Sequence, residues 1–143
     1  MARVAAGIVI LPYGLQKLGF YGGVGIASTL TDFKNRKLPQ FIAWLVIISQ
    51  TLGSIALIIG FCSRLAAAGA IIIFTAAIFV HLPDGWQLNW YNKKKGEGVE
   101  YFVLLLALLW IVLIYGGGAY SIDRFLDTTI LWRPVPAVIP LCR

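Results

Sequence analysis

Charged residues are scarce in this chain of 143 residues: they make up 13% of it, whereas 59% of the residues are hydrophobic. Soluble domains usually carry about a quarter charged residues. A single domain of this length has too small an interior to hide so much apolar surface from water. The shortage of charge therefore excludes an ordinary soluble protein and indicates a small integral membrane protein.

Residues that ligate metals or act in catalysis are also few. The chain has one histidine, His81, and two cysteines, Cys62 and Cys142, which form no CxxC pair. A zinc site needs three or four clustered ligands, and haem held by two histidines needs a second one. No Ser-His-Asp order, phosphate loop or dinucleotide fingerprint occurs. We expect no metal, no cofactor bound by a motif of this chain, and two unpaired thiols; a flavin or nicotinamide would come with a partner.

The positive charge does not indicate a nucleic-acid-binding protein. The formal net charge is +6, but the basic residues fall in short clusters between apolar segments, such as Lys34 to Lys37 and Lys93 to Lys95. No basic helix or stacking platform for bases is present. Loop clusters of this kind are typical of membrane proteins whose loops face anionic lipid. Membrane lipids are therefore the expected partners of these charges, and nucleic acid is not.

Four apolar stretches predict membrane helices at about residues 3–20, 39–62, 65–82 and 100–118. Crossing a bilayer takes about 20 apolar residues. We predict an all-α integral membrane protein, a four-transmembrane-helix bundle over residues 1–123 with both termini on the same side. Between the first two helices, Ile26 to Phe33 are expected to form an interfacial turn or short helix. Residues 124–143, which contain three prolines, are expected to form an interfacial, partly extended tail.

The second predicted helix carries two further features. Gly53, Ala56 and Gly60 form a small-residue face that would let a neighbouring helix approach closely. Gln50 lies near its middle, where an amide in lipid needs a partner. A hydrogen bond across helices is the favoured interpretation of Gln50, ahead of ligand binding.

Ionisable residues gather at the two ends of the predicted bundle. Arg3, Arg64 and Asp123 fall at the end that holds the termini, and we interpret them as a structural ion cluster. Lys17, His81 and Glu100 fall at helix ends on the opposite, loop side.

The loop-side trio admits two interpretations. Ionisable groups within membrane segments are costly and often functional. A cation, an imidazole and a carboxylate around one cavity would suit a quinone head group and the transfer of its protons. The alternative is an interfacial salt bridge between Lys17 and Glu100, with His81 capping a helix.

Short motifs at the ends of the apolar segments resemble those of a known membrane family. They are Arg3, Gly7, Gly14 to Leu18 (GLQKL), Gly60 to Arg64 (GFCSR), His81, Gly98 to Glu100 (GVE) and Gly116 to Asp123 (GGGAYSID). Together with their spacing, they resemble the DoxX/DoxD family over roughly residues 3 to 124. The chain departs from that pattern at Gln50, near which many relatives carry an acid, and in the tail from Phe125, which has no counterpart.

The resemblance implies a membrane subunit of an oxidoreductase complex in the plasma or inner membrane of a prokaryotic cell. Relatives include the small subunit of thiosulfate:quinone oxidoreductase and a membrane component of a mycobacterial thiol-stress complex. The implied role is a quinone-side site that receives electrons from a sulfur or thiol donor handled by a partner subunit. The alternative is a non-catalytic accessory subunit, docked through its small-residue helix faces and its tail. A carrier or channel is disfavoured because four helices alone leave little room for a pathway.

Overall fold

The structure, a computed structural model, describes residues 1–87, 98–118 and 120–125. The predicted tail from residue 126 onward and the Lys93–Lys95 loop lie outside these ranges. Within them, the regular secondary structure is helical. The elements are α1 (Ala2–Lys17), the 3-10 turn η1 (Phe20–Gly22), α2 (Gly25–Asn35), α3 (Gln40–Ile48), the π-helical turn η2 (Ser49–Gly53), α4 (Ser54–Ile59), α5 (Ser63–His81), the 3-10 turn η3 (Leu82–Asp84) and α6 (Glu100–Tyr115).

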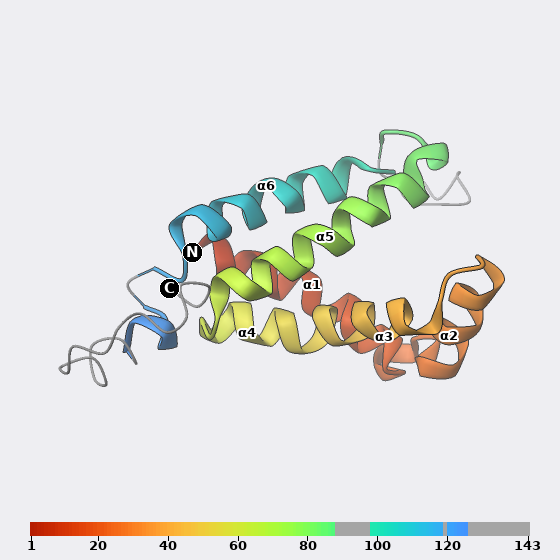
Figure 1. Cartoon of the computed structure of the whole chain (residues 1–143), viewed down its shortest axis with the longest axis horizontal. Coiled ribbons are helices and arrows are strands. Elements are labelled where there is room, and N and C mark those ends of the chain that lie inside the picture. Colours follow the sequence, from red (N-terminus) through yellow and green to blue (C-terminus); the bar gives the residue numbers. More distant parts are fainter. Residues whose placement is uncertain (88–97, 119, 126–143) are drawn as a thin grey trace.

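The helices form a bundle in which α1 lies between two partners. Figure 1 shows α5 and α6 side by side, with α1 and α4 running along the same direction of the molecule. α1 buries one stripe of residues at helical spacing, and these meet α4, η2 and α6: Arg3, Ala6, Gly7, Ile10 and Gly14. Leu57 of α4, Phe74 of α5 and Leu109 of α6 belong to the same buried core. A stripe with this period is how a helix hides one face and leaves the other to its surroundings.

The second predicted helix, 39–62, is present as α3, η2 and α4 in succession, from Gln40 to Ile59. Its middle is a π-helical turn, a widened turn of the kind often found at functional sites. Hydroxyl groups bond back to the backbone there: Thr51 Oγ1 donates to Ile47 O at 2.6 Å, and Ser54 Oγ donates to Gln50 O at 2.7 Å. Such bonds compete with the regular helical ladder.

Glycines end three of the helices earlier than predicted. α1 stops at Lys17 and not at residue 20, because Gly19 has φ 93°. The second helix stops before Gly60, with φ 78°, and α6 stops before Gly116, with φ 72°. A left-handed residue after the last turn is a common way for a helix to end. The third predicted helix, 65–82, is observed as Ser63–His81.

Close helix approach is made by glycines of α1. A Cβ placed on Gly7 would lie 2.7 Å from Ser54 O, and one placed on Gly14 would lie 2.5 Å from Gln50 O. At Gly53 the nearest atom would be 3.6 Å away, within its own helix. The close approach to the second helix is therefore made by glycines of α1, and Gly53 of the predicted small-residue face does not contribute to it.

The chain turns sharply after α1. α1 and the segment Phe20–Asn35 meet at 91° across a short break, and α2 corresponds to the interfacial short helix predicted at Ile26 to Phe33. Lys34, Arg36 and Lys37 are exposed at the end of α2.

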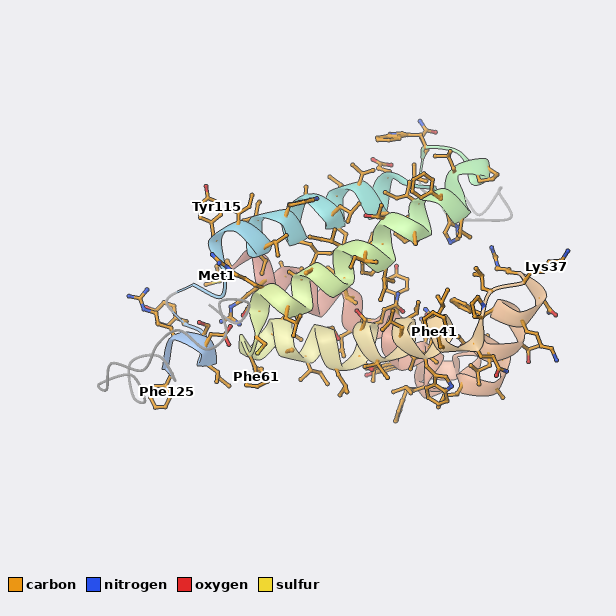
Figure 2. The ribbon with its side chains drawn as sticks, viewed as in Figure 1. Met1, Lys37, Phe41, Phe61, Tyr115 and Phe125 are labelled. Carbon is orange, nitrogen blue, oxygen red and sulfur yellow. The ribbon has the colours of Figure 1, made fainter. Side chains whose placement is uncertain are left out.

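Two helices in the described ranges are long and apolar enough to cross a membrane: Gln40–Ile59, with 20 residues, and Ser63–His81, with 19. The bent pair Ala2–Lys17 and Phe20–Asn35 would be a third if it counts as one span, and α6 is apolar but shorter. Large apolar side chains cover the outside of the bundle; Ile72 is 68% exposed and Phe79 72%. Figure 2 shows Phe61 and Tyr115 pointing away from the helices. An apolar exterior of this kind is matched to lipid rather than to water.

Candidate functional site

Arg3 closes the end of the bundle that holds the N-terminus. It is only 7% exposed, and its guanidinium donates to four backbone carbonyls on two segments, the end of α4 and the stretch after α6. The acceptors are Gly117 O at 2.7 Å, Leu57 O at 2.9 Å, Ile58 O at 2.7 Å and Tyr120 O. These carbonyls lie where helices end, so they have no partner within their own helix. Arg3 thus ties α1 to the ends of α4 and α6.

Asp123 caps α5 from a distant part of the chain. Its carboxylate accepts from the backbone N–H of Cys62 at 2.6 Å and of Ser63 at 2.9 Å. It also accepts from Ser63 Oγ at 2.8 Å. A carboxylate at a helix N-terminus satisfies free N–H groups and is favoured by the helix dipole.

The expectation of an unpaired thiol at Cys62 is wrong, because the Cys62 thiol is not free in the structure. Cys142 lies outside the described residues.

Arg64 also bonds to backbone. Its Nη2 donates to Ile114 O at 2.9 Å near the end of α6, while its buried Nε has no partner. The structure therefore brings Arg3, Arg64 and Asp123 to one end of the bundle. Each is held by backbone groups or by Ser63, and the three side chains do not pair with one another. Their described contacts are those of residues that fasten helix ends.

The loop-side trio lies at the opposite end. Lys17 is the last residue of α1, His81 the last of α5 and Glu100 the first of α6, and each is half-buried. The ring of His81 stacks on Phe102 of α6, with centroids 5.3 Å apart. The stacking holds the ends of α5 and α6 together, so His81 and Glu100 belong to one helix pair.

Lys17 differs from the other two members of the trio. In residues 1–87, 98–118 and 120–125 it forms neither an ion pair nor a hydrogen bond, and so no salt bridge joins it to Glu100. His81 and Glu100 both take part in further interactions. Over the same ranges, no group of three His, Cys, Asp or Glu side chains could hold a metal ion.

Two further polar side chains have buried atoms without a well-formed hydrogen bond. Gln50 is 8% exposed, and its Oε1 accepts no hydrogen bond. The hydrogen bond across helices that the sequence favours for the Gln50 amide is therefore not made by this oxygen. The hydroxyl of Tyr101, the residue after Glu100, is likewise buried without a well-formed hydrogen bond, and its polar interaction is with the side chain of Tyr13. The sequence pattern did not single out Tyr101, because tyrosines at the ends of membrane helices are common as interface anchors.

Tyr13 and Gly14, in the last turns of α1, contact Tyr101 and Gln50 respectively. The ring of Tyr13 lies 5.5 Å from that of Tyr101, and Gly14 lies against the backbone of Gln50. Lys17 follows one turn later on the same face of α1. The last turns of α1 thus face η2 on one side and the start of α6 on the other.

An all-helical bundle with an apolar exterior and ionisable residues at its helix ends defines a helical membrane protein. A family model, DoxX, matches residues 1–82, which is more than half of the chain, and the chain therefore belongs to the DoxX family. The matched range contains Lys17, Gln50 and His81, whereas Glu100 and Asp123 follow it. No curated protein matches the chain. No solved structure matches it either.

Proposed function

We propose that this protein is the membrane subunit of an oxidoreductase complex and provides the site at which a quinone receives electrons. It would sit as a multi-pass protein in the plasma membrane of a prokaryotic cell, next to partner subunits that oxidise a sulfur or thiol compound. The observation that carries the proposal is that Lys17, His81 and Glu100 are each half-buried and each stand at a helix end on the same side of an apolar bundle. Membership of the DoxX family supports an association with oxidoreductases.

The topology that belongs to this proposal has four crossings: α1, α3 to α4, α5 and α6. Supporting it, Arg3 bonds to Gly117, so that the start of α1 and the end of α6 share one end of the bundle. Both termini of the four-helix unit would then lie on one side of the membrane, with Lys17, His81 and Glu100 on the other. α2, at 91° to α1, would lie along the interface on that second side.

In this proposal Lys17 binds the quinone, whereas His81 and Glu100 serve its protonation. Two electrons and two protons convert a quinone into its quinol; the electrons come from the sulfur or thiol compound oxidised on a partner subunit. Lys17 would donate a hydrogen bond to a quinone carbonyl, which gains negative charge during reduction. His81 and Glu100 would pass the protons, because an imidazole and a carboxylate can each act as a general acid or base.

The test starts from gentle detergent extraction of the native membrane and mass spectrometry of the co-purifying proteins. A rhodanese-like, thiosulfate-oxidising or thiol-redox partner is the expected result. In that complex, His81→Phe and Glu100→Gln should lower quinone-dependent turnover by about tenfold or more, with unchanged assembly. His81→Phe keeps an aromatic ring against Phe102, so the helix contact survives. Asp32→Asn, at an exposed position of α2, is the matched control.

Normal turnover in both variants would show that the trio is not the quinone site. Stoichiometric recovery with a respiratory or transport complex, together with fully active variants, would make the chain an accessory subunit.

A further inference from the structure

The two helices that are long and apolar enough to cross a membrane, Gln40–Ile59 and Ser63–His81, follow one another in the chain and are joined by the short turn of residues 60–62. α4 and α5 contact each other on either side of this turn. Because both helices have the length of a span, the turn lies at one side of the membrane, and the outer ends of the pair, at Gln40 and His81, lie at the other. The sidedness of this pair does not depend on whether α1 and α6 also cross.

The turn carries a cysteine in oxidised form. Cys62 is disulfide-bonded and only partly buried, and its backbone N–H donates to the Asp123 carboxylate. The sequence contains one other cysteine, Cys142, so within a single chain only Cys142 can supply the second sulfur. Disulfides form and persist in the periplasm and at cell surfaces, whereas cytoplasmic thiols are kept reduced. The bond at Cys62 therefore indicates that the turn faces an oxidising compartment.

Basic residues flank the opposite ends of the same pair. Lys34, Arg36 and Lys37 precede the first span and are exposed, and three lysines, residues 93–95, follow the second span in the sequence. The turn itself has no charge, and the one basic residue beside it is Arg64, which donates to a backbone carbonyl. Lysine and arginine close to the ends of membrane helices favour the cytoplasmic side. Six basic residues against one therefore indicate, independently of the disulfide, that the outer ends face the cytoplasm.

We propose that Cys62 and Cys142 form a disulfide on the extracytoplasmic side of the membrane, and that the end of the bundle with Lys34, Arg36 and Lys37 faces the cytoplasm. The disulfide forms by thiol–disulfide exchange with an oxidised dithiol protein of the extracytoplasmic compartment. The two cysteines lose two electrons and two protons and form one S–S bond, while the disulfide of the donor protein is reduced to two thiols.

This sidedness goes beyond the proposed function and does not depend on it. His81 ends the second span at the cytoplasmic side, and Lys17 and Glu100 stand at the same end of the bundle. In the complex proposed above, the partner subunits that oxidise the sulfur or thiol compound therefore approach from the cytoplasm. The protons that convert quinone into quinol are taken up from the same side.

The redox state is read from cells precipitated with acid, which stops thiol exchange. The precipitate is dissolved in denaturing detergent with a maleimide-linked polymer that adds visible mass to each free thiol. Wild-type protein should gain no polymer before reduction and two after it. Cys62→Ser and Cys142→Ser should each gain one polymer without reduction, because each substitution frees the other cysteine. Two polymers on unreduced wild type would overturn the proposal, as would a covalent dimer that dissociates on reduction, since that bond would join two chains.

Sidedness is tested in a chain that lacks both native cysteines, through Cys62→Ser and Cys142→Ser, and carries one new cysteine. Asn35→Cys stands among the exposed basic residues, and Tyr120→Cys, at a position 92% exposed, stands at the end of the bundle with Cys62. In intact spheroplasts a membrane-impermeant maleimide should label Tyr120→Cys and not Asn35→Cys. After permeabilisation both should be labelled, which controls for access. Any other pattern in intact spheroplasts would overturn the orientation, whereas quinone-dependent turnover of the His81 and Glu100 variants decides the proposed function separately.

Discussion

Asp123 and Ser63 are 60 positions apart in the sequence and are joined by two hydrogen bonds, from Ser63 N at 2.9 Å and from Ser63 Oγ at 2.8 Å. The backbone N–H of Asp123 in turn donates to Gly60 O at 3.0 Å. The segment after α6 is therefore fixed to the turn between α4 and α5. This contact makes the end of the bundle one unit.

Removing the Asp123 carboxylate should loosen that unit. Asp123→Ala is expected to lower the free energy of unfolding by about 1–2 kcal/mol, the usual effect of losing a helix cap. The measurement is unfolding in mixed micelles by titration with a denaturing detergent. In a double-mutant cycle, Ser63→Ala should cost less in the Asp123→Ala background than in the wild type. Asp32→Ala, at an exposed position, is the control, and fully additive effects of the two substitutions would contradict the bond.

Replacing Arg3 should have a larger effect. Arg3→Met keeps most of the side-chain volume but leaves four carbonyls without their donor, and a loss of at least about 3 kcal/mol is expected. Arg3→Lys should be intermediate, because an ammonium group has no planar fork. The same detergent titration measures both variants, with Arg36→Met at an exposed position as control. An Arg3→Met protein as stable as wild type would refute the anchoring role.

Glycine substitutions should show which glycines lie in the contact between α1 and the second helix. Gly14→Ala places a methyl group 2.5 Å from Gln50 O and should cost about 1–3 kcal/mol. Gly53→Ala meets nothing closer than 3.6 Å and should be neutral or stabilising by about 0.5–1 kcal/mol. Thermal unfolding of the two purified variants in one detergent makes the comparison. The opposite ranking would mean that Gly53 makes the helix contact.

The basic residues after α2 should select anionic lipid. Lys34, Arg36 and Lys37 lie within four positions and are exposed, and each basic residue near an anionic membrane surface contributes about 1 kcal/mol. Changing all three to glutamine should reduce the phosphatidylglycerol that co-purifies relative to phosphatidylcholine, as measured by mass spectrometry. A variant in which Lys34 and Lys37 become arginine and Arg36 becomes lysine keeps the charge and should retain the lipid. Equal retention by the glutamine variant would show that the cluster does not bind lipid.

Sequence patterns located the helices well, because hydropathy and length act within one segment at a time. The apolar runs placed the second, third and fourth helices, and the motifs at their ends indicated the DoxX family. The helix ends were less well predicted. Gly19, Gly60 and Gly116 end their helices through a positive φ, and a glycine in an apolar run is equally compatible with continued helix.

The candidate site was predicted only in part. Lys17, His81 and Glu100 could be named because charge in an apolar chain is conspicuous. Whether Lys17 pairs with Glu100 depends on the rotation of α1 and α6 about their axes, and hydropathy does not specify rotation. Tyr101 was missed for the same reason, since only packing decides whether a tyrosine hydroxyl is buried or wet.

The sequence by itself determined that this is an apolar, helical chain with charged groups confined to the ends of its segments. These properties follow from local composition, which sets what each stretch can bury. The tertiary structure decided the partners: Arg3 bonds to carbonyls rather than to an acid, Asp123 caps a helix, and Gln50 remains without a hydrogen bond to its Oε1. The hydrogen-bond partner of a side chain depends on which turns of different helices meet. The π-helical turn and the close approach at Gly14 set these meeting points only when the bundle is assembled.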